Sequence, residues 1–550
     1  MIDITCRLVS TWERTLIGLF QAGSYNMNIA HKQSGEMRTF LLRLKLTMLH
    51  INTKHLIIYV LLCPITALVH PLISASDAKN ITQKPNIVII LADDLGWDDV
   101  SYHGSDISTP NIDNLVSEGI ELNRFYAQPT CSPSRAALMT GKSPKRLGIS
   151  RALTKNQKIG LSLGEKILPQ YLGEVGYRSV MVGKWHLGGY TPAYAPLKRG
   201  FEHFYGYLHG GIGYWDHNHG GGRDWQRNGQ TIRENGYSTE LLGNEAIRLI
   251  EQHDANYPLF LYLAFGAPHL PNEAPIKQIA NYEHIANQNR RIHAAMVAEL
   301  DQQVGRVISA LKENNMANNT LILFTSDNGG LVSKDKNMAS IFRRLAPVAT
   351  FLFGRPIPIT SLEGIASMFY DGGSSNYPLR GGKISALEGG VRVPGALWWP
   401  SQLSSKRYNN FMTLSDVLPT LLEAVGGYEK IEDNIDGVSH WPSIFHDKKV
   451  ISPPYIVTGF EKTALYQPPW KLIIGDEINL YNVYDDPEES YNLATQMSQR
   501  VENMKKMIDE WPAGDERGVD FFKFFQDPDS FGGTEDRIPW AEFAIENLEK

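Results

Sequence analysis

The chain has 550 residues, of which 42% are hydrophobic and 20% are charged, a composition that excludes a disordered or fibrous protein. Its 53 basic and 59 acidic side chains leave a net charge of −6, which excludes the broadly basic surface of a nucleic-acid-binding protein. The three cysteines, Cys6, Cys63 and Cys131, are too few for a disulfide-rich scaffold or a zinc site built from cysteines.

The first 76 residues contain the pattern of a targeting segment. An apolar run at 56–69 follows Lys54 and precedes a group of small residues, as in a secretory signal peptide. The run is shorter than the ~20 residues that a membrane-spanning helix needs. We therefore predict a signal peptide over 48–76, after an N-terminal extension of uncertain nature at 1–47. An uncleaved membrane anchor at 56–73 is the alternative.

Two further features fit a secreted or lysosomal protein. Asn80 and Asn318 each begin an Asn-x-Thr sequon for N-glycosylation. Cleavage near residue 76 would leave Cys131 as the sole cysteine, and a lone cysteine in an oxidising compartment requires an explanation.

Continuous apolar runs alternate with amphipathic helical segments between about residues 85 and 425. The runs predict buried parallel strands at 86–92, 178–182, 259–265 and 321–325, and the clearest helical patterns lie at 239–253 and 292–313. This alternation predicts an α/β domain, with a large, mostly parallel sheet flanked by helices on both faces. We place this domain at 84–440.

After residue 440 the pattern changes to short strand candidates bounded by turns. They lie at 455–459, 470–474 and 478–484, and a helical pattern follows at 498–510. The sequence therefore predicts a small C-terminal subdomain with an antiparallel sheet, over 441–550.

Polar residues follow the end of each strong strand candidate. They are Asp93 and Asp94 after the first, Lys184 and His186 after the second, His269 after the third, and Asp327 and Asn328 after the fourth. In open α/β sheets, the site lies at the carboxyl ends of the strands. Adjacent carboxylates repel each other unless a cation neutralises them, and ligands that are all oxygen favour Ca²⁺ or Mg²⁺ over zinc.

The sharpest motif is Cys131-Ser-Pro-Ser-Arg135. Pro133 suits the first turn of a helix, and the residues after Arg135 continue a helical pattern. Cys131 is therefore predicted at a helix N-terminus, where free N–H groups and the helix dipole favour an anion.

The cysteine motif and the other segments together resemble the type I sulfatases, most closely the arylsulfatase B group. The segments that carry the resemblance are, in chain order, Ala92-Asp-Asp-Leu-Gly-Trp97, Gly183-Lys-Trp-His-Leu-Gly188, Pro268-His269, Ser326-Asp-Asn-Gly-Gly330, Pro378-Leu-Arg-Gly-Gly-Lys383 and Glu388-Gly-Gly-Val-Arg392. The resemblance runs from about residue 85 to 500. It implies the alkaline-phosphatase-like sulfatase fold and a sulfuric ester hydrolase.

The resemblance also implies two cofactors. The cysteine would be oxidised after synthesis to formylglycine, an aldehyde that hydrates to a diol, by a formylglycine-generating enzyme. One Ca²⁺ would be held by the oxygen-bearing residues, with the modified cysteine near it: Asp93, Asp94, Asp327, Asn328 and Cys131.

The remaining residues of the motifs take catalytic roles by the same resemblance. Arg135 and Lys184 would orient the diol, whose first hydroxyl attacks sulfur. His186 would remove a proton from the second hydroxyl, so that sulfate is expelled. His269 and Lys383 would bind the sulfate ester and protonate the leaving oxygen. We expect both histidines to have nearly ordinary pKa values, which suit such proton transfers.

The predicted function is hydrolysis of sulfate monoesters, with sulfated sugars of glycosaminoglycans or aryl sulfates as substrates and no nucleic-acid partner. The alternatives are a phosphatase or phosphodiesterase of the same superfamily, which usually has a Ser or Thr nucleophile and two metals, or an inactive sulfatase-like binding protein. One segment departs from the family, because the apolar stretch 331–370 replaces a short polar loop. We predict that this stretch is dispensable.

Overall fold

The computed structural model describes residues 84–154, 158–219, 222–332, 372–431, 434–459 and 462–518. The predicted signal peptide, the extension before it, the sequon at Asn80 and all but the first two residues of 331–370 lie outside the described residues. Within the described ranges, no helix combines the length and the apolar character needed to cross a membrane.

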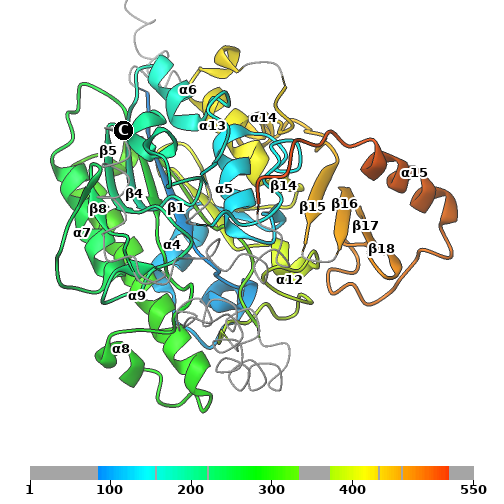
Figure 1. Cartoon of the computed structure of the whole chain (residues 1–550), viewed down its shortest axis with the longest axis horizontal. Coiled ribbons are helices and arrows are strands. Elements are labelled where there is room, and N and C mark those ends of the chain that lie inside the picture. Colours follow the sequence, from blue (N-terminus) through cyan, green and yellow to red (C-terminus); the bar gives the residue numbers. More distant parts are fainter. Residues whose placement is uncertain are drawn as a thin grey trace, which may run out of the picture. The chain divides into compact units, whose positions relative to one another are not determined.

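A mixed sheet forms the centre of the fold (Figure 1). In the described part of the chain its ten strands follow the spatial order β13 (Lys406–Tyr408), β2 (Ile120–Leu122), β12 (Gly395–Trp398), β11 (Thr320–Ser326), β1 (Asn86–Ala92), β10 (Leu259–Ala264), β4 (Arg178–Lys184), β5 (His203–Tyr207), β8 (Gln226–Arg227) and β9 (Gln230–Thr231). The strands from β11 to β5 pair in parallel, whereas β12 and β8 join them antiparallel on either side. The predicted, mostly parallel sheet is confirmed.

The apolar strands lie between two hydrophobic cores, one on each face of the sheet. Along β1, Ile87, Ile89 and Leu91 lie in one hydrophobic cluster, and Val88 and Ile90 lie in the other. Successive side chains of a strand point to opposite faces, so a strand between two cores needs apolar residues throughout. This requirement explains why β1 reads as a continuous apolar run.

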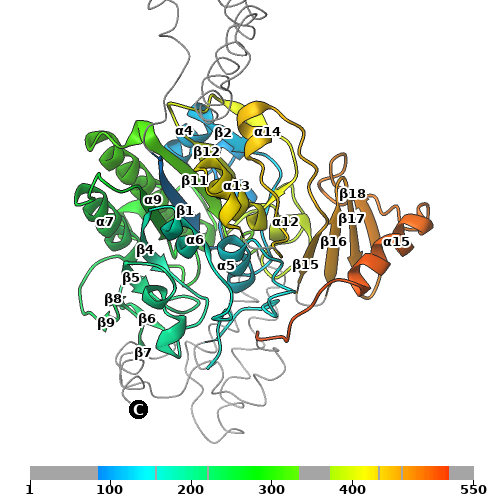
Figure 2. The ribbon, with the colours of Figure 1, turned by 90° about the horizontal axis from the view of Figure 1, so that it is seen from above.

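Helices cover both faces of the sheet, as predicted (Figure 2). One face packs against α5 (Cys131–Thr140), α6 (Leu168–Glu174) and α13 (Val417–Ala424). The other packs against α4 (Pro110–Glu118), α7 (Ser238–Glu251) and α9 (Gln288–Glu313). The remaining short elements are β3 (Phe125–Tyr126), β6 (Asn218–His219), β7 (Gly222–Arg223), α8 (Ile276–Ala280), α12 (Glu388–Val391), β14 (Met412–Thr413) and α14 (Trp441–His446).

The C-terminal part forms a separate antiparallel sheet, as predicted (Figure 1). It consists of β15 (Tyr455–Thr458), β16 (Thr463–Gln467), β17 (Trp470–Ile474) and β18 (Ile478–Asn482), with α15 (Ser498–Asp509) packed on it. The opposite face packs against Tyr126 and Phe411 of the large domain. β16 was not predicted, because its Thr-Ala-Leu-Tyr-Gln sequence is short and only partly apolar.

A buried ion cluster fastens this small sheet to the large domain. The Nζ atom of Lys471, on β17, lies 3.0 Å from Glu388 Oε1 and 2.7 Å from Glu489 Oε1, and all three side chains are fully buried. The hydroxyls of Tyr126 and Tyr466 donate to Glu388 at 2.9 and 2.6 Å. The cluster therefore links strand β17 to α12, a few residues beyond Lys383.

Candidate active site

The four strands whose ends carry the candidate residues are neighbours in the sheet. Their order is β11, β1, β10, β4, and each pairs in parallel with the next. The carboxyl ends of parallel strands meet at one edge, which brings together residues that are far apart in sequence. The structure therefore places the predicted residues at one site.

The acidic residues lie at the centre of this site. Asn328 Nδ2 donates to Asp94 Oδ1 at 2.7 Å, and the backbone N–H of Asp94 donates to Asp327 Oδ1 at 3.3 Å. Asp93, Asp94, Asp327 and Asn328 are each at most 2% exposed. Asp94 has a left-handed backbone, with φ of 67°, as single residues held in place at functional sites often do.

Each carboxylate has a cationic partner. Lys184 Nζ lies 2.6 Å from Asp93 Oδ2, and Lys383 Nζ lies 2.7 Å from Asp94 Oδ2. Arg135 donates to Asp327 Oδ2 from Nε at 3.0 Å and from Nη2 at 2.8 Å. These pairs are charge-assisted hydrogen bonds in a buried setting, where an unpaired charge would be costly.

The pKa values of two carboxyls move in opposite directions. Burial raises the pKa of Asp94, but the positive charges of Lys383 and Lys184 outweigh it and leave the pKa below its ordinary value. Burial is the largest effect that raises the pKa of Asp327, and the negative charge of the neighbouring Asp93 raises it further. Positive charge therefore gathers on the Asp94 side of the site.

Cys131 is the first residue of α5, as the motif predicts. Its side chain is buried, and Sγ lies 3.4 Å from Asp93 Oδ1. Burial, with the negative charge of Asp327, raises the pKa of the thiol well above its ordinary value. Because the thiolate is the nucleophilic form of cysteine, the unmodified side chain is a poor nucleophile here.

The two histidines differ from the expectation of ordinary pKa values. His186 is buried and its pKa is lowered well below the usual value, first by burial and then by Lys184. Burial and the charge of Lys383 lower the pKa of His269 to about 3. The expectation was wrong because the sequence does not show that His186 is buried and His269 largely buried, nor that Lys383 lies near His269.

Both histidine rings are held by backbone carbonyls. His186 Nε2 lies 2.9 Å from the carbonyl oxygen of Leu153, and His269 Nδ1 lies 2.7 Å from that of Leu270. His269 Nε2 then faces Asp94 Oδ2 at 3.6 Å. Each carbonyl accepts a hydrogen bond from the ring N–H that faces it, so the opposite nitrogen of each neutral ring carries the lone pair.

The site has the donors that a hard cation needs. Ligand atoms of Asp93, Asp94, Cys131 and His269 lie within 4.8 Å of one another. Asn328 Oδ1 is buried without a hydrogen-bond partner in the described part of the chain, which a coordinated cation would satisfy. The carboxylate and amide oxygens suit Ca²⁺. The predicted ligands therefore fit, and His269, for which a catalytic role is predicted, lies among them.

Sequence reasoning missed the strand β5 and the turn that follows it. A Cβ atom at Gly210 would lie 3.0 Å from His186 Cε1, and one at Gly211 would lie 3.1 Å from His269 Nδ1. Only glycine allows the backbone to approach both rings so closely. The signal was present as a Gly-Gly pair separated by two residues from the end of β5, but β5 is too aromatic and glycine-containing to read as a buried parallel strand.

Comparison with known proteins agrees with this geometry. The sulfatase family profile matches residues 85–428. Arylsulfatase J of Mus musculus is 36% identical over 373 residues, which cover 66% of this chain and 56% of that protein. N-acetylgalactosamine-6-sulfatase of Homo sapiens is 30% identical over 406 residues, 70% of each protein. These relatives support the family and not specifically the arylsulfatase B group.

Solved structures are similar over most of the chain. The structure of Ps i-CgsB in complex with k-i-k-neocarrahexaose has a TM-score of 0.69 and 29% identity, and covers 85% of this chain and 99% of that one. The PsFucS1 sulfatase from Pseudoalteromonas sp. has a TM-score of 0.63 and 25% identity, and covers 79% of this chain and 92% of that one. The chain therefore belongs to the sulfatase family, and with it to the sulfuric ester hydrolases.

Proposed function

We propose that this chain hydrolyses sulfate monoesters of carbohydrates, with a formylglycine made from Cys131 and one Ca²⁺. The observation that carries the proposal is the meeting of Cys131 with Lys184, Lys383 and His269 around a buried acidic centre. A sulfate monoester is an anion, and its reaction needs fixed positive groups where negative charge develops. This arrangement supplies them at one edge of the sheet.

Two cofactors complete the proposed site. Asp93, Asp94, Asp327 and Asn328 would hold Ca²⁺, whose charge neutralises the sulfate oxygens. Formylglycine, once hydrated, supplies one hydroxyl as the nucleophile and a second through which sulfate is released. The raised pKa of the Cys131 thiol supports modification, because the unmodified side chain would stay protonated at neutral pH.

The substrate enters from the side of Lys383 and His269. Their side chains are 14% and 20% exposed, whereas those of Lys184 and Arg135 are fully buried. Lys383 and His269 therefore meet the ester, while Lys184 and Arg135 hold Asp93 and Asp327 in place. An anionic sulfate beside His269 raises its low pKa, so that Nε2 can carry the proton given to the leaving oxygen.

His186 has the properties of a base. Its Nε2–H is donated to the carbonyl of Leu153, and its Nδ1 has no hydrogen-bond partner among the described residues. Burial and the charge of Lys184 lower the pKa of the ring, so the ring is neutral and Nδ1 carries its lone pair. We assign to it the proton that must leave the hydrated Cys131 derivative for sulfate to be released.

The proposed substrate class is sulfated carbohydrate. The name of one relative specifies N-acetylgalactosamine 6-sulfate chemistry, and a similar solved structure contains neocarrahexaose. Both of those ligands are sugars, which supports a sulfated sugar rather than a small aryl sulfate as the natural substrate. Glycosaminoglycans are the polymers that we propose to test first.

We further propose that the protein matures in the secretory pathway and acts in the lysosome or outside the cell. A formylglycine-generating enzyme would be its partner during maturation. Asn318 is exposed at the turn before β11, so its side chain has room for a glycan, whereas Thr320 of the same sequon is buried in the folded chain. An N-glycan at Asn318, detected as a mass shift on glycosidase treatment, would support this route.

The test is hydrolysis by the protein purified from the medium of expressing cells. Wild-type protein is assayed on 4-nitrophenyl sulfate, 4-nitrophenyl phosphate and sulfated glycosaminoglycan oligosaccharides, with Cys131→Ser as the matched control. We expect release of sulfate by the wild type and none by the variant. Turnover of the phosphate ester alone would contradict the proposal and favour a phosphatase, and no turnover at all would favour a binding protein.

A further inference from the structure

One carboxamide joins the segments that carry the catalytic groups. The Oδ1 atom of Asn376 accepts hydrogen bonds from the backbone N–H groups of Trp97 at 3.2 Å and Gly330 at 3.0 Å. Its Nδ2 donates to the carbonyls of Gly330 at 3.0 Å and Gly381 at 3.1 Å. Asn376 is 2% exposed, so water cannot easily replace these four bonds.

Each joined segment leads directly to a residue of the site. Trp97 follows the Asp93–Asp94 pair, Gly330 follows Asn328, and Gly381 precedes Lys383. A backbone hydrogen bond of 3.0 Å from Lys383 to Gly330 reinforces the same junction. The carboxamide therefore sets the distance between the metal-binding loops and the loop of the catalytic lysine.

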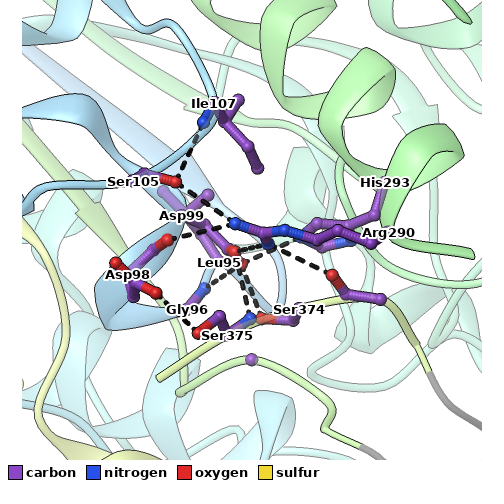
Figure 3. Close-up of polar contacts among 12 residues, drawn as sticks. Leu95, Gly96, Asp98, Asp99, Ser105, Ile107, Arg290, His293, Ser374 and Ser375 are labelled. Atoms are coloured by element: carbon purple, nitrogen blue, oxygen red, sulfur yellow. Dashed lines mark hydrogen bonds and ion pairs between the residues drawn. The ribbon is translucent and has the colours of Figure 1, made fainter. Parts of the chain in front are cut away.

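The residues before Asn376 are themselves held firmly (Figure 3). Asp99 accepts from the Ser374 hydroxyl at 2.5 Å and from the Ser375 N–H at 3.1 Å. Arg290 and His293, on α9, both contact the carboxylate of Asp99, and Arg290 also donates to the carbonyl of Gly373 at 3.1 Å. The backbone that carries the Asn376 carboxamide is therefore held in place by these hydrogen bonds and ion pairs.

We propose that Asn376 is a positioning residue of the active site, an inference that rests on the proposed function. It acts through backbone groups, because its four hydrogen bonds go to Trp97, Gly330 and Gly381. All donors and acceptors of the carboxamide are used, so no other side chain of this size reproduces the pattern. Its loss leaves Lys383 tied to the metal-binding loops only by its backbone bond to Gly330 and its pairing with Asp94.

The test compares two buried asparagines, each of which forms side-chain hydrogen bonds to separate strands or loops. Asn376→Ala removes all four bonds, and Asn376→Asp keeps the shape and the acceptor but loses the two donated bonds. The control is Asn86→Ala, at the other end of β1, where the carboxamide bonds Leu259 N at 2.9 Å and Thr320 Oγ1 at 3.4 Å. Asn86 is 8% exposed.

Two readouts separate positioning from simple stability. With 4-nitrophenyl sulfate, we expect kcat to fall about 10–100-fold in both Asn376 variants, with a smaller change in KM, because a misplacement of ~1 Å costs this much. By calorimetry, we expect Ca²⁺ affinity to fall about 10-fold. Asn86→Ala should lower Tm but leave kcat and Ca²⁺ affinity as in the wild type.

Each result decides the question. A folded Asn376→Ala protein with wild-type kcat and Ca²⁺ affinity overturns the inference, as does an equal loss of kcat in Asn86→Ala. If neither Asn376 variant folds, the residue serves folding and the inference is also overturned. If the wild type hydrolyses no sulfate ester, the proposed function fails, and the Ca²⁺ affinities alone then decide the role of Asn376.

Discussion

Replacement of Lys471 by methionine would test the ion cluster that fastens the small sheet to the large domain. The substitution keeps an unbranched side chain, one atom shorter, but removes the charge that lies 3.0 Å from Glu388 and 2.7 Å from Glu489. Two buried carboxylates then face each other without a cation. Removal of one partner from a buried ion pair typically costs about 3–5 kcal/mol.

The structure favours the lower end of this range. Glu388 keeps the hydroxyl donors of Tyr126 and Tyr466, and Glu489 keeps the backbone N–H of Glu388 at 2.9 Å. We therefore expect a loss of about 3 kcal/mol in the free energy of unfolding near pH 8. At roughly 1 kcal/mol per °C for a folded unit of this size, Tm falls by ~3 °C.

The loss should depend on pH in a defined direction. Burial raises the pKa of Glu489, Lys471 opposes this effect, and Glu388 adds to it. Without Lys471 the folded-state pKa rises further above the unfolded value of ~4.3. A folded state that binds more protons than the unfolded state loses stability as pH rises through the folded-state pKa. The variant should therefore be less impaired at pH 5 than at pH 8.

The assay is thermal and urea unfolding of the wild type and variants at both pH values. Lys505→Met is the matched control, because Lys505 is 36% exposed and pairs with Glu502 only at 3.6 Å, so its loss should cost less than ~0.5 kcal/mol. The double variant Lys471→Met with Glu489→Gln should recover part of the loss. A cost below ~1 kcal/mol at pH 8, or the same cost at both pH values, would refute the reasoning.

Four other outcomes follow from the site. Mass spectrometry of the peptide containing Cys131 should show the aldehyde, and a fully free thiol in active enzyme would contradict the assignment. Lys383→Ala should fold normally but lose about 10²–10³-fold in kcat, because it removes a charge that stabilises the leaving oxygen; an unchanged kcat would argue against this role. Elemental analysis should find one calcium per chain, and two zinc ions would indicate a phosphatase. Deletion of 331–370 should preserve folding and activity, because the two ends of the segment lie close together: a Cβ at Gly372, just beyond the segment, would lie 2.6 Å from the carbonyl of Leu331, its first residue; loss of activity on deletion would show that the segment is needed.

The main elements could be predicted because their patterns are local. The predicted strand at 86–92 coincides with β1, and the predicted helix at 498–510 matches α15 to within one residue. Long apolar or amphipathic runs report burial directly, since no other arrangement removes that much apolar surface from water. The strands β5 and β16 were missed because aromatic, polar and glycine residues interrupt their patterns.

The sequence by itself indicated which residues we propose to carry the chemistry. Cys131 and Arg135 form one continuous motif, and Asp93, Asp327 and Lys184 each occur at the end of a recognisable strand. The rule that sites lie at the carboxyl edge of parallel strands then brought these residues together without knowledge of their contacts.

Only the tertiary structure decided how these groups act on one another. The pairing of Arg135 with Asp327, the position of His269 near Lys383, and the four hydrogen bonds of Asn376 all join segments distant in the chain. A pKa depends on desolvation and on charges within a few ångströms, and neither quantity is encoded in local sequence. The chemistry of the residues is therefore a property of the sequence, whereas their protonation and positions are properties of the fold.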